Sequence, residues 1–193
     1  MYLSTAITDI SVAVSLRALC LDATDGQIKW NVEVFSPETS AAKQVHTKNS
    51  LASPTPIIHA DRLYVHFGHM GTAALDLDGN IIWKQAALSY QPRHGNGGSP
   101  VLVNDLLVFS CDSEKEPFLT ALDQASGEVR WKTARNSSAL KTFSFSTPLI
   151  IEIDGTQQIV SPASGFVGAY DPQDGHEIWR VKYGEGYSVV PRP

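Results

Sequence analysis

One short pattern occurs four times along this chain of 193 residues: an Asp, a turn that contains Gly, and a Trp. Its clearest copy is ALDQASGEVRW, residues 121–131. The four Trp residues are separated by 53, 48 and 48 residues, and the chain has no Trp outside the pattern; they are Trp30, Trp83, Trp131 and Trp179. A period of this length indicates a solenoid, a propeller or another repeat array.

The other positions of the pattern give it a structural interpretation. The Asp stands seven or eight residues before the Trp, and the residue two before the Asp is Ala or Cys. An Asp carboxylate can accept hydrogen bonds from turn amides, and Gly tolerates the positive φ of a tight hairpin. We expect the Trp to pack on the neighbouring unit, with the small residue leaving room for its ring. The Asp and Gly positions are Asp22, Gly26, Asp76, Gly79, Asp123, Gly127, Asp171 and Gly175.

Each repeat also reads as four short strands. In the last one, the β-branched segment 148–153 and the turn DGT lead to QQIVS, then to FVGAYD, and finally to HEIWRV after the turn PQDG. No segment shows helical periodicity. Four antiparallel strands in about fifty residues are typical of a β-propeller blade. We therefore predict an all-β fold, a partial β-propeller of four-stranded antiparallel blades.

The blade boundaries follow from inner strands that begin at Ser-Pro or Ser-Thr-Pro. We expect one partial propeller over 1–193, with clear third and fourth strands from about Leu16 to Val34 in the partial first blade. Because propellers usually close with more blades than this, we interpret the chain as a fragment. The alternative is a half-propeller that self-associates through its open blade edges. The expected segments are a partial blade at 1–35, blades at 53–88, 99–135 and 146–183, and the start of a further blade at 187–193.

The pattern A-x-D-x-x-[ST]-G-x-x-x-W of residues 121–131 resembles the tryptophan-docking motif of the quinoprotein-like propellers. That group includes the pyrroloquinoline-quinone (PQQ) dehydrogenases and the BamB outer-membrane assembly factors. The segments HGNGGSPVL and GFVGAYDP are similar to PQQ-binding-like repeat proteins of planctomycete-type bacteria. The resemblance implies a bacterial protein that is periplasmic or secreted, and it makes PQQ a candidate cofactor.

Charge, hydropathy and the lack of known motifs argue against several other classes of protein. The formal net charge of −5 disfavours nucleic-acid binding, which needs clustered positive charge. No apolar run is long enough to span a bilayer, and the N-terminal residues do not resemble a signal peptide. No Ser–His–Asp arrangement and no phosphate-binding loop is recognisable. We assign no catalytic residue.

The propeller topology places six loops on one face, which we call the rim. They are 45–53, 66–71, 90–99, 112–117, 140–146 and 184–193. Although the chain is acidic, cationic and amide side chains gather in these loops. The predicted ligand-binding residues are His46, Lys48, Asn49, His66, His69, Arg93, His94, Asn96, Lys141 and Arg192.

The rim supports two interpretations. Its donors could bind a small anionic or carbonyl-rich ligand, or an acidic segment of a partner protein. Alternatively, the polar loops could merely solvate the mouth of a propeller. His66 and His69 share a short loop, but no carboxylate or Cys stands at a supporting spacing, so we assign no metal site.

Two function classes remain. The first is a non-catalytic binding or scaffolding propeller, as the BamB-like resemblance implies. The second is part of a PQQ-dependent dehydrogenase, with the cofactor site mostly in blades beyond this chain. Such alcohol dehydrogenases have an adjacent Cys pair, whereas Cys20 and Cys111 fall in different repeats here. The four repeat Asp residues are expected in turns, which leaves no evident calcium cage. The sequence therefore favours the first class.

Overall fold

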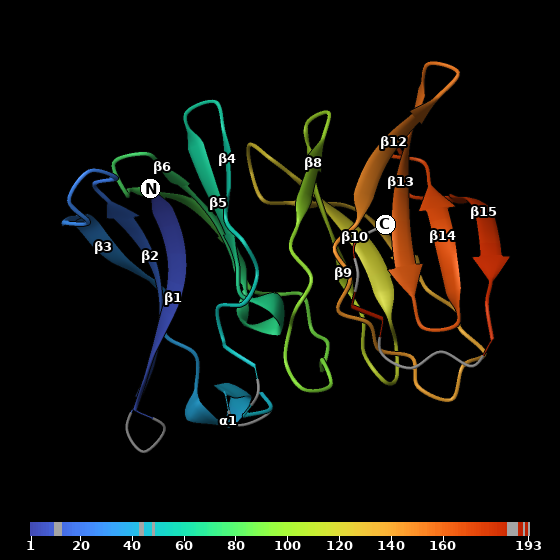
Figure 1. Cartoon of the computed structure of the whole chain (residues 1–193), viewed down its shortest axis with the longest axis horizontal. Helices are drawn as coiled ribbons and strands as arrows, with labels where there is room; N and C mark the ends of the chain where they lie inside the picture. The colour runs from blue at the N-terminus through green and yellow to red at the C-terminus, as the bar shows by residue number, and fades with distance from the viewer. Residues whose placement is uncertain (10–12, 43–44, 48, 185–188, 191, 193) are drawn as a thin grey trace. The chain divides into compact units, whose positions relative to one another are not determined.

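The computed structural model describes residues 1–9, 13–42, 45–47, 49–184, 189–190 and 192. The chain forms two compact units. Unit 1 contains Met1–Ser89 and His94–Asn96, and unit 2 contains Tyr90–Arg93 and Gly97–Pro193. In Figure 1, unit 1 runs from blue to green and unit 2 from yellow-green to red. Each unit is described by itself.

Unit 1 contains two antiparallel sheets. Sheet A has three strands in the order β1-β2-β3, and sheet B has four in the order β4-β5-β6-β7. The strands of sheet A are β1 (Tyr2–Asp9), β2 (Ala13–Leu21) and β3 (Ile28–Phe35). Those of sheet B are β4 (Ile57–His59), β5 (Arg62–His66), β6 (Thr72–Asp76) and β7 (Ile81–Gln85). A short helix α1 (Thr39–Ala42) and a 3-10 turn η1 (Gly68–Met70) complete the unit.

Unit 2 contains two further antiparallel sheets of four strands, C and D, whose strands follow one another in chain order. Sheet C contains β8 (Val101–Val103), β9 (Leu106–Cys111), β10 (Phe118–Asp123) and β11 (Val129–Ala134). Sheet D contains β12 (Leu149–Ile153), β13 (Thr156–Ala163), β14 (Phe166–Tyr170) and β15 (Glu177–Lys182).

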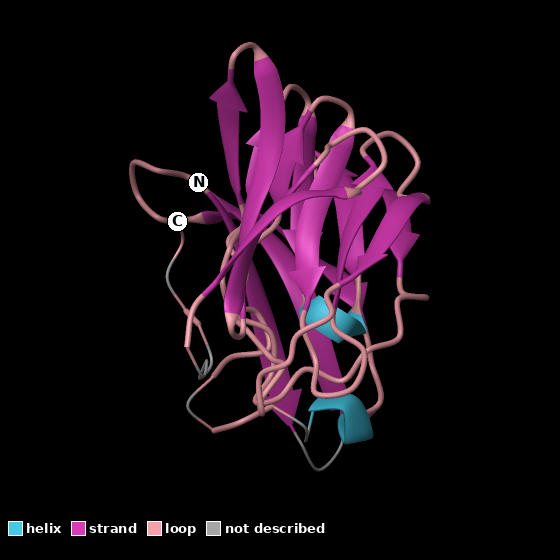
Figure 2. Cartoon of the chain, turned by 90° about the vertical axis from the view of Figure 1, so that its right-hand side faces the viewer, coloured by secondary structure: helices cyan, strands magenta, loops and turns pink. Residues whose placement is uncertain are grey.

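Strands dominate the described residues, and among these residues helix is confined to the two short segments α1 and η1 (Figure 2). The predicted all-β class is confirmed. Sheet A contains one strand more than the two that the sequence pattern indicated in this region. Strand β1 pairs with β2 along its whole length, with Tyr2 opposite Cys20 and Asp9 opposite Ala13. Its sequence, YLSTAITD, alternates only weakly between apolar and polar residues, so it gave no clear strand signal.

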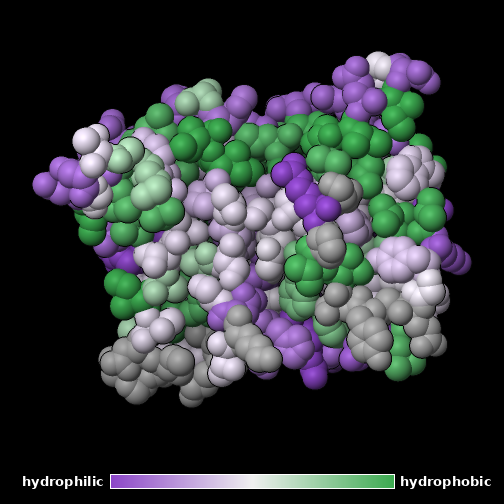
Figure 3. All heavy atoms as spheres, viewed as in Figure 1, coloured by the Kyte–Doolittle hydropathy of each residue, from purple (hydrophilic) through white to green (hydrophobic). Residues whose placement is uncertain are grey.

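The hairpins that join the first two strands of sheets B, C and D share a backbone conformation. The first turn residue has a positive φ in each case: Ala60 at 52°, Asn104 at 52° and Asp154 at 50°. At Asp154 the next residue, Gly155, also has a positive φ of 76°, as the type I′ turn of a two-residue hairpin requires. Hydrophilic residues cover the tip of this β12–β13 hairpin, above a more hydrophobic zone (upper right of Figure 3).

Each unit has its own hydrophobic core between its two sheets. In unit 1, Leu16 and Val34 of sheet A cluster with Leu63 and Leu75 of sheet B. In unit 2, Val108 and Leu119 of sheet C cluster with Ile159 and Tyr170 of sheet D, and Trp131 belongs to the same cluster. Burial of these apolar side chains holds each pair of sheets together.

Candidate functional site

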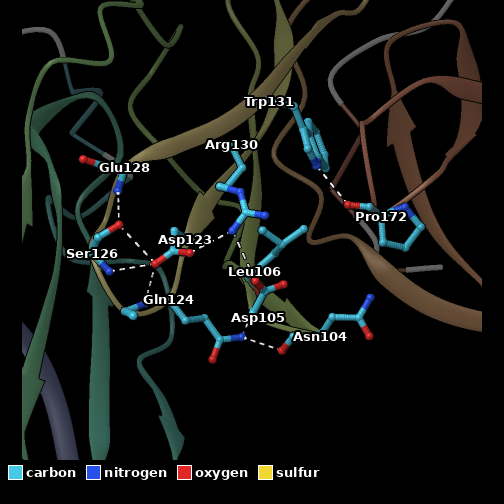
Figure 4. A network of polar contacts seen from close by, with 11 residues as sticks. Asn104, Asp105, Leu106, Asp123, Gln124, Ser126, Glu128, Arg130, Trp131 and Pro172 are labelled. Atoms are coloured by element: carbon cyan, nitrogen blue, oxygen red, sulfur yellow. Dashed lines mark hydrogen bonds and ion pairs between the residues drawn. The ribbon is translucent and has the colours of Figure 1, made fainter.

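The repeat Trp joins the two sheets within each unit. In unit 1, the Trp30 indole Nε1 donates a hydrogen bond of 2.9 Å to the Leu77 carbonyl of sheet B. In unit 2, Trp131 donates one of 2.9 Å to the Pro172 carbonyl of sheet D, as Figure 4 shows. Leu77 and Pro172 each follow the repeat Asp of their own sheet. The indole therefore docks on the Asp–Gly turn of the next sheet.

The small residue of the motif lies directly opposite the Trp of its own sheet. Cys20 faces Trp30 across β2 and β3, and Ala121 faces Trp131 across β10 and β11. Ala74 with Trp83 and Ala169 with Trp179 follow the same register. A small side chain at this position leaves space beside the large ring.

The repeat Asp carboxylates are occupied by their own turns. Asp22 accepts a hydrogen bond of 2.8 Å from the Thr24 amide, and Asp171 accepts one of 2.7 Å from the Gln173 amide. Asp76 and Asp123 accept two turn amides each. The bond from the Thr24 amide, helped by Lys29, lowers the pKa of Asp22 to about 2. These four residues are therefore turn-forming groups.

Unit 1 brings four of the predicted rim residues together. The amide of His46 and the side-chain amide of Asn49 both donate to the carbonyl of His94, at 3.3 and 3.0 Å. Asn49 also donates to the carbonyl of Asn96, at 3.3 Å. These bonds hold residues 94–96 against the 45–53 loop. The rings of His46 and His94 meet edge to face, with 5.0 Å between their centroids, and both residues are exposed.

The remaining unit 1 candidates are placed differently. His66, at the end of β5, is buried, and its Nδ1 lies 2.8 Å from the Thr72 hydroxyl. Burial, with the nearby His69, lowers the pKa of His66 to about 3, so this ring is neutral at physiological pH. His69 lies in η1 and is only partly exposed. Lys48 falls outside the described residues.

In unit 2, hydrogen bonds join several of the predicted rim loops. The Thr142 hydroxyl donates to the Ser113 carbonyl at 2.7 Å, and the Phe145 amide donates to the Val189 carbonyl at 2.8 Å. Three of the loops are therefore adjacent. Arg93 forms an ion pair of 3.1 Å with Glu114, which offsets part of its charge. Two further predicted cations, Lys141 and Arg192, are exposed.

The sequence pattern did not indicate a buried ion pair at the end of sheet C, where Arg135 also contacts sheet D. Arg135, just beyond β11, donates to both carboxylate oxygens of Asp112, at 2.8 and 3.1 Å. Both side chains are inaccessible to solvent, with exposures of 0 and 1%. Arg135 also donates to the Ser161 carbonyl of sheet D at 3.0 Å. The sequence carried one signal: the fourth residue after Trp is uncharged in the other repeats and is Arg only here.

The described residues offer no site that fits PQQ with calcium. Among them, no group of three or more His, Cys, Asp or Glu side chains lies close enough to hold a metal ion. Cys20 and Cys111 are both buried, and they lie in different sheets. The repeat Asp carboxylates already accept turn amides, as described above.

Among the described residues, no helix has the length and apolar character needed to cross a membrane.

Comparisons with known proteins agree with this architecture. Residues 17–187 match the family model described as outer membrane protein assembly factor BamB. None of the curated proteins matches the chain in sequence. BamB from Moraxella catarrhalis is similar in structure, with a TM-score of 0.60, 16% identity, and alignment over 96% of this chain and 53% of that one. The chain thus spans about half the length of this BamB.

Two oxidoreductase structures are also similar. A europium-containing methanol dehydrogenase gives a TM-score of 0.66 and 12% identity, over 94% of this chain and 39% of that one. The quinohemoprotein alcohol dehydrogenase from Comamonas testosteroni gives a TM-score of 0.51 and 11% identity, over 96% of this chain and 45% of that one. At this identity the likeness establishes the fold alone, that of a partial β-propeller. Because the family model covers most of the sequence, the chain belongs to the BamB family of PQQ-like β-propeller repeat proteins.

Proposed function

We propose that this chain is a non-catalytic binding module whose rim loops bind an acidic segment of a partner protein, in the periplasm or outside the cell. The observation that carries the proposal is the cluster of His46, Asn49, His94 and Asn96 in unit 1. Three hydrogen bonds hold the backbone of this cluster, and the two imidazole rings stand exposed beside each other. A backbone that is fixed before binding loses little conformational entropy when a ligand arrives, and here it carries the two exposed imidazole rings.

Charge supports the same choice of ligand. The chain carries a formal net charge of −5, yet exposed Lys141 and Arg192 lie in the predicted rim loops of unit 2. Carboxylate groups would pair with these cations and with imidazole or amide donors. Small anions share this chemistry, but an extended acidic segment can contact more than one of the rim loops that are adjacent within unit 2. Within the same unit, Arg93 already forms an ion pair with Glu114, so part of its charge is offset before any ligand binds.

The proposal is tested with a fluorescein-labelled oligoglutamate peptide, whose binding is measured by fluorescence anisotropy at low salt. We expect the paired substitution His46→Ala with His94→Ala, and Lys141→Ala alone, each to weaken binding about five- to tenfold. His176→Ala and Lys29→Ala are matched controls, because these exposed residues pair with Asp174 and Asp22 outside the rim loops. Equal losses in both sets, or no binding at all, would contradict the proposal.

A second measurement separates this function from quinoprotein catalysis. The protein is titrated with PQQ and calcium, followed by absorbance and by dye reduction with an alcohol present. We expect neither stoichiometric uptake nor dye reduction, because the described residues lack a matching site. Stoichiometric uptake with alcohol-dependent reduction would overturn the non-catalytic assignment.

A further inference from the structure

The buried ion pair of unit 2 belongs to a larger polar network between sheets C and D. Arg135 uses its two terminal nitrogens for Asp112 and for the Ser161 carbonyl. Three other atoms of this region are buried and make no direct hydrogen bond: Arg135 Nε, Ser161 Oγ and the Tyr170 hydroxyl oxygen. Buried polar atoms in native proteins almost always have a partner, which is either protein or ordered water.

Strand register brings Ser161 and Tyr170 near each other. Ser161 of β13 lies opposite Gly168 of β14, and Tyr170 follows two residues later on the same face. A side chain at Gly168 would lie 2.7 Å from the Tyr170 hydroxyl. The tyrosine ring therefore lies along its own strand, over Gly168, and its hydroxyl approaches Ser161. Gly is needed here because this close approach leaves no space for a side chain.

Arg135 reaches the same place from sheet C. Its guanidinium group bonds the carbonyl of Ser161, so its Nε lies close to that residue. Burial raises the pKa of Tyr170, while the charge of Arg135 and a hydrogen-bonding contribution from Arg135 partly oppose this effect, as expected for neighbours. The two groups are thus close, yet no hydrogen bond of ordinary length and angle reaches the Tyr170 hydroxyl or Arg135 Nε. Polar groups separated by slightly more than bonding distance are commonly bridged by water.

We propose that one water molecule is buried between sheets C and D, where it hydrogen-bonds Arg135 Nε, the Tyr170 hydroxyl and Ser161 Oγ. Three partners of this kind match the usual coordination of a buried water. The site selects a neutral ligand over an anion such as chloride, because Asp112 already balances the charge of Arg135. The water would link the end of β11 to β13 and β14.

A double-mutant cycle on the whole chain tests the site in solution. Tyr170→Phe and Ser161→Ala each remove one ligand, and each should raise the unfolding equilibrium constant about fivefold or more. If one water connects the two residues, the double variant should be only about as unstable as the worse single variant. If the fold-change in the double variant equals the product of the two single fold-changes, the residues act independently, and the proposed shared site would be overturned.

The control pairs Tyr170→Phe with Ser110→Ala. Ser110 is also a buried serine of unit 2, but its hydroxyl already donates directly to the Ser146 carbonyl at 3.3 Å. The effects of this pair should therefore multiply. If the control pair deviates from multiplication as much as the test pair does, the variants destabilise unit 2 in a general way. That result would contradict the proposed water.

A high-resolution crystal structure gives the direct answer. We expect one density peak at about 2.7–3.2 Å from the three atoms. A bromide soak should leave that peak without anomalous signal. Direct bonds among the three side chains with no density between them, or bromide at the site, would overturn the proposal.

Discussion

The two units join their sheets in the same way at the turn but differently in the interior. In both, an indole donates to the carbonyl that follows the Asp of the next sheet, at 2.9 Å. Four residues after the Trp, unit 1 has Val34 in an apolar cluster, whereas unit 2 has Arg135 in a buried ion pair. The repeat motif therefore specifies the docking of one sheet on the next, while the interior can be apolar or polar.

The largest difference between the units should appear when these two residues are truncated. Arg135→Ala leaves Asp112 buried without its cation, which should lower the free energy of unfolding by about 3–5 kcal/mol. Val34→Ala removes only apolar contacts and should cost about 2 kcal/mol. Urea denaturation of both variants measures the values. If Arg135→Ala costs no more than Val34→Ala, the ion pair is not essential to the interior of unit 2.

The next comparison uses two motif glycines with the same backbone conformation. Gly26 and Gly175 both have a φ of 75°. A Cβ at Gly26 would meet nothing within 4 Å, whereas one at Gly175 would lie 2.4 Å from Trp131. Gly26→Ala should therefore cost about 1 kcal/mol from backbone strain alone. Gly175→Ala should cost on the order of 3 kcal/mol, because it also displaces the docked indole.

Denaturant midpoints of the two glycine variants provide the readout. Similar losses of stability in the two variants would show that the Trp131 ring does not pack tightly on the turn at Gly175. A loss at Gly175 that disappears when Trp131 is also replaced by a smaller residue would sharpen the comparison, because it would assign the extra cost to the indole itself.

The last comparison concerns the effect of pH on stability, whose sign differs between the buried Asp112 and the exposed Asp22. Burial raises the pKa of Asp112 to about 6, against the opposing effect of Arg135. The folded protein then holds this proton more tightly than the unfolded chain does. Ionisation of Asp112 therefore lowers stability as pH rises from about 4 to 6, by on the order of 2 kcal/mol. Asp22, with its pKa lowered to about 2, stabilises the fold above about pH 4 and loses this contribution at lower pH.

Asp112→Asn isolates the buried carboxylate. The difference in unfolding free energy between this variant and the natural chain should change between pH 4 and pH 6 and stay constant above pH 7. A difference that does not vary with pH in that window would contradict the raised pKa. The ordinary acid loss from turn residues such as Asp22 is common to both proteins and cancels.

Local chemistry explains which parts of the fold were predictable. The Asp–Gly turns and the Trp strands depend on residues close in sequence, so spacing and turn preferences were enough to predict the sheets. Asp112 and Arg135 lie 23 residues apart; Asp112 begins a predicted rim loop, and Arg135 is the last residue of the predicted blade 99–135. Their burial depends on how sheet D covers the end of sheet C. This packing cannot be predicted from residues that are close in sequence.

The sequence was enough to predict which segments are rim loops, but not which of their side chains are buried or exposed. Sequence placed His46, His66 and His94 together on polar loops, whereas the structure leaves His46 and His94 exposed and buries His66 beside Thr72. His66 is the last residue of strand β5, and its burial depends on packing within unit 1. Periodicity in the sequence does not distinguish such a histidine from an exposed one.

Hydrogen exchange at the indole nitrogens tests the docking of sheet on sheet most directly. The exchange of the Nε1–H groups of Trp30 and Trp131, which donate to Leu77 and Pro172, is to be followed by NMR on the whole chain. Both should exchange far more slowly than a free indole, and Trp131 more slowly than Trp30, because its hydrogen bond is the more deeply buried. Exchange of both at the rate of a solvent-exposed indole would contradict the account.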